Sequence, residues 1–132
     1  MIKTVDVSVS GQGLYDISAS IAGAVDIEEG LCTLFIRHTS ASLLIQENYD
    51  PSAKLDLERW LNRLVPENDL DYTHLIEGPD DMPAHIKSAL TSTSLSIPVM
   101  AGSLMLGTWQ GIFLWEHRHR PAVRQIVLHL NE

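Results

Sequence analysis

Two apolar runs within residues 94–118 constrain the fold of this chain more than any other stretch of it. They flank a Gly-Thr-Trp-Gln tetrad, and Gly102 and Gly107 mark turns between them. β-branched and aromatic residues bounded by glycines predict an antiparallel pair of buried strands. A period of two in the second run puts Gln110 and Glu116 on one face, at opposite ends of the strand. A strand with polar residues at its ends and apolar residues between them suits a site at the rim of a sheet.

Length and charge limit what the chain does. Its 132 residues predict one domain over 1–132. With 17 acidic and 9 basic residues the net charge is −8, which argues against a nucleic-acid or anionic-membrane surface, since both need a basic patch. The single Cys32 excludes an internal disulfide and fits a reducing compartment. No basic-then-apolar leader or membrane-length apolar run is present, so we expect a cytoplasmic protein.

Hydrophobic periodicity predicts an α+β fold, mainly antiparallel β-sheet, sandwich- or barrel-like, in one domain with about seven strands and about three helices. The longest helix is predicted over 50–65, because Asp50 can cap it, Pro51 suits a first turn and Pro66 closes it. Further helices are predicted over 19–25 and 83–90. Strands are predicted over 3–9, 14–17, 31–37, 42–46 and 122–130.

His38 follows the predicted central strand, and two interpretations of it stay open. It could be a hydrogen-bonding residue at a strand end. It could also be a metal ligand or an acid–base group, with hydroxyls of Thr39, Ser40 and Ser42 available to phosphate oxygens.

Residues 68–83 form a polar, acidic stretch that is either a solvated loop or a functional one, since loops of this length are often functional. Asp81 precedes the helix predicted over 83–90, which places His85 in the first turn. There the helix dipole disfavours an imidazolium ion. A neutral imidazole suits a divalent metal, so His85 is the strongest ligand candidate.

The chain resembles the YjbQ-like family, the secondary thiamine-phosphate synthases, over nearly its whole length. The resemblance is carried by His38-Thr39-Ser40-Ala41-Ser42, Glu47-Asn48, Asp50-Pro51, Tyr72, His74, Glu77-Gly78, residues 80–85, and Ser94, Ile97, Val99, Gly102, Gly107, Thr108, Trp109, Gln110 and Ile112.

The resemblance implies a metal-dependent reaction that joins hydroxymethylpyrimidine diphosphate to thiazole phosphate and releases pyrophosphate. His38, His74 and His85 stand at the family's histidine-bearing motifs. Three protein ligands with an open fourth position describe a catalytic zinc-type site, with magnesium as the alternative if a diphosphate is bound. The catalytic candidates are Glu47, Asp81, Gln110 and Glu116, and the substrate-binding candidates are Thr39, Ser40, Asn48, Thr108, Trp109 and Arg118.

Two other functions stay open. The resemblance implies a homotrimer, and a strand with two Trp residues suits a buried subunit contact, so the protein could be a non-catalytic metal- or ligand-binding trimer. A polar rim around a metal also suits a metal-dependent phosphoester hydrolase. The enzymatic interpretation requires the three imidazoles to meet beside residues 108–110.

Overall fold

The computed structural model describes residues 1–132 and contains two antiparallel sheets and three helices. The strands are β1 (Ile2–Val9), β2 (Gly13–Asp16), β3 (Glu29–Ile36), β4 (Ala41–Glu47), β5 (Ser94–Met100), β6 (Ser103–Leu104), β7 (Gln110–Glu116) and β8 (Ala122–Asn131). The helices are α1 (Ser18–Ala24), α2 (Pro51–Leu64) and α3 (Asp81–Leu90). This confirms the α+β, mainly antiparallel class.

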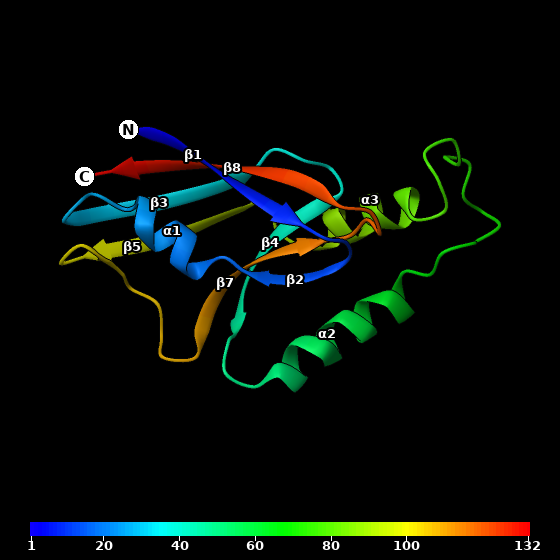
Figure 1. Ribbon diagram of the computed structural model, residues 1–132, viewed down its shortest axis with the longest axis horizontal. Coiled ribbons are helices and arrows are strands. Elements are labelled where there is room, and N and C mark those ends of the chain that lie inside the picture. Colours follow the sequence, from blue (N-terminus) through cyan, green and yellow to red (C-terminus); the bar gives the residue numbers. More distant parts are fainter.

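The larger sheet has the order β1-β8-β3-β5-β6. Its outer pair joins the two ends of the chain, since Ile2 lies opposite His129, and both termini lie at the same end of the molecule (Figure 1). β3 lies between β8 and β5, as predicted for a central strand. Its alternate residues Cys32, Leu34 and Ile36 are buried in the main core.

The smaller sheet has the order β2-β7-β4 and packs both of its faces. Ile112 and Leu114 of β7 point into the main core between the two sheets. Phe113 and Trp115, on the other face of β7, pack in a second cluster with Leu61 of α2. Burial on both faces explains why β7 is an almost continuous apolar run.

The prediction that residues 94–118 form one antiparallel pair is wrong. β5 pairs with β3 and β6, whereas β7 pairs with β2 and β4 in the other sheet. Gly102, with φ of 74°, closes the tight β5–β6 turn, and the chain then crosses to the second sheet. The strand expected to carry two Trp residues carries one, since Trp115 lies in β7 and is buried within the chain, whereas the exposed Trp109 precedes β7.

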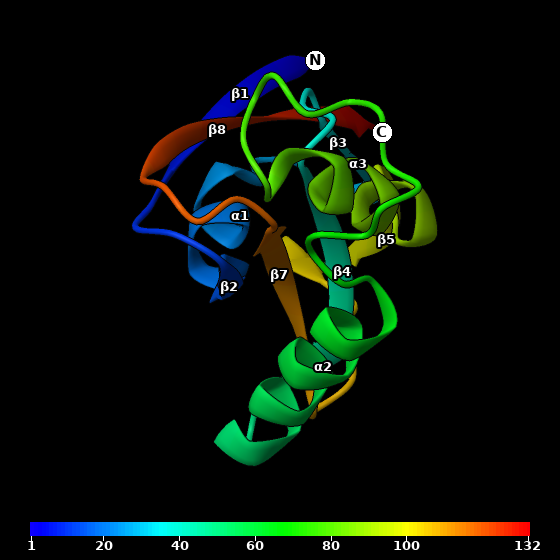
Figure 2. The same ribbon diagram turned by 90° about the vertical axis from the view of Figure 1, so that its right-hand side faces the viewer.

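α2 and α3 lie at the end of the molecule that faces the viewer in Figure 2, whereas α1 packs against β1 and β7. α2 begins as predicted, with Asp50 Oδ1 accepting a hydrogen bond from Ser52 N at 2.9 Å and Pro51 in its first turn. α3 begins at Asp81, two residues earlier than predicted. His85 therefore lies in the second turn, so the helix-dipole argument for its neutrality does not apply.

Candidate active site

A cavity of about 810 Å³ opens where the β3–β4 connection, the loop before α3, α3 itself and the β7–β8 turn meet. Its charged and imidazole groups are Arg37, His38, His74, Glu77, Asp81, His85, Arg118 and Arg124. Three of the nine Lys and Arg residues of a strongly acidic chain thus line one cavity. Such a concentration of cations favours an anionic ligand.

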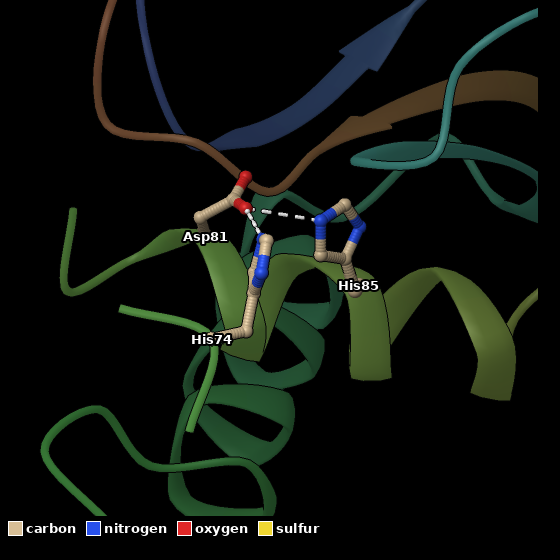
Figure 3. Close-up of side chains that lie close together, drawn as sticks. All are labelled: His74, Asp81 and His85. Carbon is tan, nitrogen blue, oxygen red and sulfur yellow. Dashed lines mark hydrogen bonds and ion pairs between the residues drawn. The ribbon is translucent and has the colours of Figure 1, made fainter. Parts of the chain in front are cut away.

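His74, Asp81 and His85 converge in this cavity (Figure 3). Asp81 Oδ2 lies 2.8 Å from His74 Nε2 and 3.0 Å from His85 Nε2. One potential ligand atom from each residue lies within 4.8 Å of the others. His74 comes from the long loop, while Asp81 and His85 are four residues apart on α3 and so share one helix face.

The hydrogen bonds of His85 fit a metal site. Its Nδ1 lies 3.0 Å from the carbonyl oxygen of Thr39, which can only accept, so Nδ1 carries the proton. In a neutral ring, the lone pair of Nε2 then faces the carboxylate oxygen of Asp81, and the two electron-rich atoms repel each other. A cation bound by both atoms would remove this repulsion. An imidazole that donates its other N–H to a backbone carbonyl is the usual arrangement of a metal-bound histidine.

The spacing of the three donors also suits a small divalent ion. Tetrahedral zinc with bonds of about 2.0–2.1 Å keeps its ligand atoms about 3.3 Å apart. The two separations from Asp81 Oδ2, 2.8 and 3.0 Å, need to widen by only a few tenths of an ångström, and the two imidazole nitrogens lie within 4.8 Å of each other. His74, Asp81 and His85 therefore fit a metal, and leave a fourth position for another ligand.

Arg118 fixes the carboxylate that the two imidazoles share. Its guanidinium donates from Nη1 to Asp81 Oδ1 at 2.6 Å, from Nε to Asp80 Oδ2 at 2.9 Å, and from Nη2 to the Glu77 carbonyl at 2.8 Å. Burial raises the pKa of Asp80, but hydrogen bonds from Arg118 and the His119 backbone outweigh it and bring that pKa to about 2. Arg118 is buried, and each of its guanidinium nitrogens contacts a protein acceptor. This geometry suits positioning of Asp81, whereas the sequence had placed Arg118 among the substrate-binding candidates.

A second buried ion pair holds the other side of the cavity. Arg124 of β8 donates to Glu116 of β7 through Nε at 2.8 Å and Nη2 at 2.6 Å, and Nη2 also reaches Ser40 Oγ at 2.9 Å. Glu116, a catalytic candidate, is entirely buried in this pair. The hydroxyl oxygen of Ser40, a substrate-binding candidate, accepts a hydrogen bond from Arg124.

His38 lies in the same cavity but outside the His74–Asp81–His85 group. Its Nε2 accepts from the backbone N–H of Gln125 at 2.9 Å, and Arg124 Nη1 lies 3.3 Å from its Nδ1. Burial, followed by the charge of Arg124, lowers the pKa of His38. The structure therefore brings together two of the three predicted metal ligands, with Asp81 in the place expected of His38.

The predicted meeting of the imidazoles beside residues 108–110 is wrong. Glu47 pairs with Gln110 at one end of β7, whereas Ala41 pairs with Glu116 at the other. Six residue steps of about 3.3 Å separate these ends by about 20 Å. Glu47, Asn48, Thr108, Trp109 and Gln110 thus lie far from the histidines, and Gln110 Oε1 accepts from the N–H of Gly107 within its own turn at 2.8 Å.

Two features of the site were missed from the sequence although signals for them exist. The Asp81-x-x-x-His85 spacing puts both residues on one helix face, but only pairs of histidines were considered. Arg124 shares the parity of the apolar residues Ile126, Leu128 and Leu130 of its strand, and a charge on a core-facing position indicates a buried partner.

The sequence profile of the family described as UPF0047 protein YjbQ-like matches residues 3–132. The chain belongs to the YjbQ-like family. A UPF0047 protein from a Synechocystis strain is 51% identical over 128 residues, 95% of this chain and 87% of that protein. The UPF0047 protein YjbQ of Salmonella typhimurium is 43% identical over 129 residues, 95% of this chain and 93% of that protein.

The YjbQ-like fold is also seen in a crystal structure of a conserved hypothetical protein from Thermus thermophilus. That structure superposes with a TM-score of 0.90 at 34% identity, covering 98% of this chain and 99% of the other. The family and the fold class predicted from the sequence are thereby confirmed. None of the helices of this chain is both long enough and apolar enough to cross a membrane.

Proposed function

We propose that this YjbQ-like protein is a divalent-metal-dependent enzyme that acts on a small phosphorylated substrate. The convergence of His74, Asp81 and His85 within an arginine-lined cavity is the observation that carries this proposal. Zinc suits two imidazoles and a carboxylate, and magnesium is the alternative if a diphosphate supplies further oxygen ligands.

Some groups around the cavity position the candidate metal ligands, and others contribute positive charge. Arg118 orients Asp81, and the Thr39 carbonyl orients His85, so the donor set is held before a ligand arrives. A bound divalent ion would supply Lewis-acid stabilisation of negative charge on a phosphate oxygen at its open position. The positive charges of the arginines that line the cavity also favour binding of an anionic substrate there.

Within this class, the family resemblance favours thiamine-phosphate synthesis from hydroxymethylpyrimidine diphosphate and thiazole phosphate. The test is to assay purified protein, loaded with zinc or with magnesium, for thiamine phosphate from these two precursors. His85→Ala is compared with His129→Ala, an exposed histidine of β8. We expect His85→Ala to lose bound metal and turnover with an unchanged sedimentation coefficient, and His129→Ala to keep all three.

A non-catalytic metal-binding homotrimer is the second candidate, and exposed aromatic side chains favour it. Tyr49, Trp60 and Trp109 are all more than half exposed in the single chain, which suits an association surface. Under this function the wild type assembles but shows no turnover, and His85→Ala loses assembly together with metal. Hydrolysis of a phosphate monoester by the metal-loaded wild type, without thiamine phosphate formation, would instead identify the phosphoester hydrolase.

A further inference from the structure

The three arginines of the cavity differ in what their guanidinium groups already bind. Arg118 and Arg124 have side chains only 9% exposed, and each forms an ion pair with buried carboxylates. Arg37 has an exposed side chain and forms no ion pair. The sole side-chain hydrogen bond of Arg37 runs from Nη1 to Gln125 Oε1, at 2.7 Å.

This difference decides which arginine can take a ligand. A guanidinium has five N–H donors. In Arg118, Nε, Nη1 and Nη2 all contact protein acceptors, and Nε and Nη2 of Arg124 donate to Glu116 and Ser40. Nη1 of Arg124 faces His38 Nδ1, which carries the proton of a neutral ring because Nε2 accepts from Gln125, but the charge of Arg124 is already paired with Glu116. Arg37 uses one donor on a neutral amide and keeps the others for a ligand, with its charge not neutralised by a bonded carboxylate.

Gln125 connects Arg37 with the rest of the cavity. Its side-chain oxygen accepts from Arg37, while its backbone N–H donates to His38 Nε2 at 2.9 Å. The backbone carbonyl of Gln125 also accepts from Arg37 N at 3.3 Å. One residue of β8 thus holds the guanidinium and the imidazole at the same wall of the cavity.

We propose that Arg37 binds the phosphate group of the substrate and that Gln125 is its positioning residue. The assignment rests on the proposed metal-dependent function and names its anion-binding side chain. A guanidinium fork matches two oxygens of a tetrahedral phosphate, and Arg37 lines the same cavity as His74, Asp81 and His85. The subsite favours a phosphate group over a singly charged carboxylate, because the dianion carries the larger negative charge in a cavity that would also hold the divalent ion.

The test titrates inorganic phosphate, and separately acetate, into the metal-loaded full chain by calorimetry. Loss of a charge-assisted hydrogen-bond pair predicts that Arg37→Gln weakens phosphate binding about 10- to 100-fold. Arg37→Lys keeps the charge without the fork and should give an intermediate loss. Arg63→Gln, an exposed arginine in the last turn of α2, should bind phosphate like the wild type.

Gln125→Glu distinguishes positioning of Arg37 from a merely structural role. The substitution keeps the shape of the side chain but supplies a carboxylate partner to Arg37, so it should weaken phosphate binding several-fold while the fold and metal content stay unchanged. In turnover assays, Arg37→Gln should raise KM much more than it lowers kcat.

Two results overturn the assignment: phosphate binding of Arg37→Gln equal to that of the wild type, or acetate bound by the wild type as tightly as phosphate. Both leave the metal-dependent function standing. A wild type that binds neither zinc alone nor magnesium in the presence of pyrophosphate refutes the proposed function itself, and the phosphate subsite with it.

Discussion

His117, the neighbour of Arg118 in the chain, should make the stability of this protein strongly dependent on pH. Its ring is 1% exposed, Nε2 is hydrogen-bonded to Ser42 Oγ at 2.9 Å, and Nδ1 has no partner. Burial, reinforced by the positive charges of Lys87 and Arg124, lowers the pKa of His117 to about 3. The folded protein therefore keeps this imidazole neutral under mildly acidic conditions.

The unfolded chain titrates the same ring at its ordinary pKa of 6.5. Between pH 6.5 and about 3 the unfolded state thus binds one more proton than the folded state, and the free energy of unfolding falls as the pH falls. The slope is about 1.4 kcal/mol per pH unit, so His117 alone should cost about 3 kcal/mol at pH 4.5. Below about pH 3 the loss from this residue levels off.

Urea denaturation of metal-free protein at about pH 7.5 and pH 4.5 measures this contribution. His117→Gln keeps a hydrogen-bonding group for Ser42 but cannot titrate, so the wild type should lose about 3 kcal/mol more than the variant between the two pH values. Any overall destabilisation of the variant cancels, because only the pH-dependent difference counts. His129→Gln, at an exposed position, should behave like the wild type. Equal losses in wild type and His117→Gln, within about 0.5 kcal/mol, would refute the reasoning.

Two further substitutions test the scaffold. Arg118→Met leaves two buried carboxylates without their cation, so it should cost about 3–5 kcal/mol of unfolding free energy and weaken metal binding. The control Arg63→Met, at an exposed position, should cost under about 0.5 kcal/mol. A small loss for Arg118→Met would contradict the positioning role. Gly30→Ala should destabilise the chain by about 2–4 kcal/mol in a thermal melt, because φ is 148° and the new Cβ would lie 2.1 Å from the Asn131 carbonyl oxygen. Gly23→Ala, in α1 with open space around it, is the matched control and should be neutral or slightly stabilising.

Local chemistry made most of the elements predictable. The helix expected over 50–65 is observed as Pro51–Leu64, because a cap, a first-turn proline and an apolar stripe all act within a few residues. The pairing of strands was not predictable in the same way. β7 is apolar on both faces because α2 covers one of them, and nothing in its own residues says that β2 and β4 flank it instead of β5.

In the site, too, local features were predictable from the sequence and long-range contacts were not. His74 and His85, grouped through the family's histidine-bearing motifs, do lie together in the structure. The placement of His38 could not be foreseen, because its partners Arg124 and Gln125 lie 86 and 87 residues away in the chain. Contacts of that range depend on the sheet order, which the sequence pattern leaves open.

The contact between His85 Nδ1 and residue 39 is made by a main-chain oxygen. The orientation of the His85 ring therefore depends on the backbone conformation of the β3–β4 connection and not on the threonine side chain. Other residues could occupy position 39 without turning that imidazole, whereas one inserted or deleted residue in the connection would move the carbonyl and misdirect the ring.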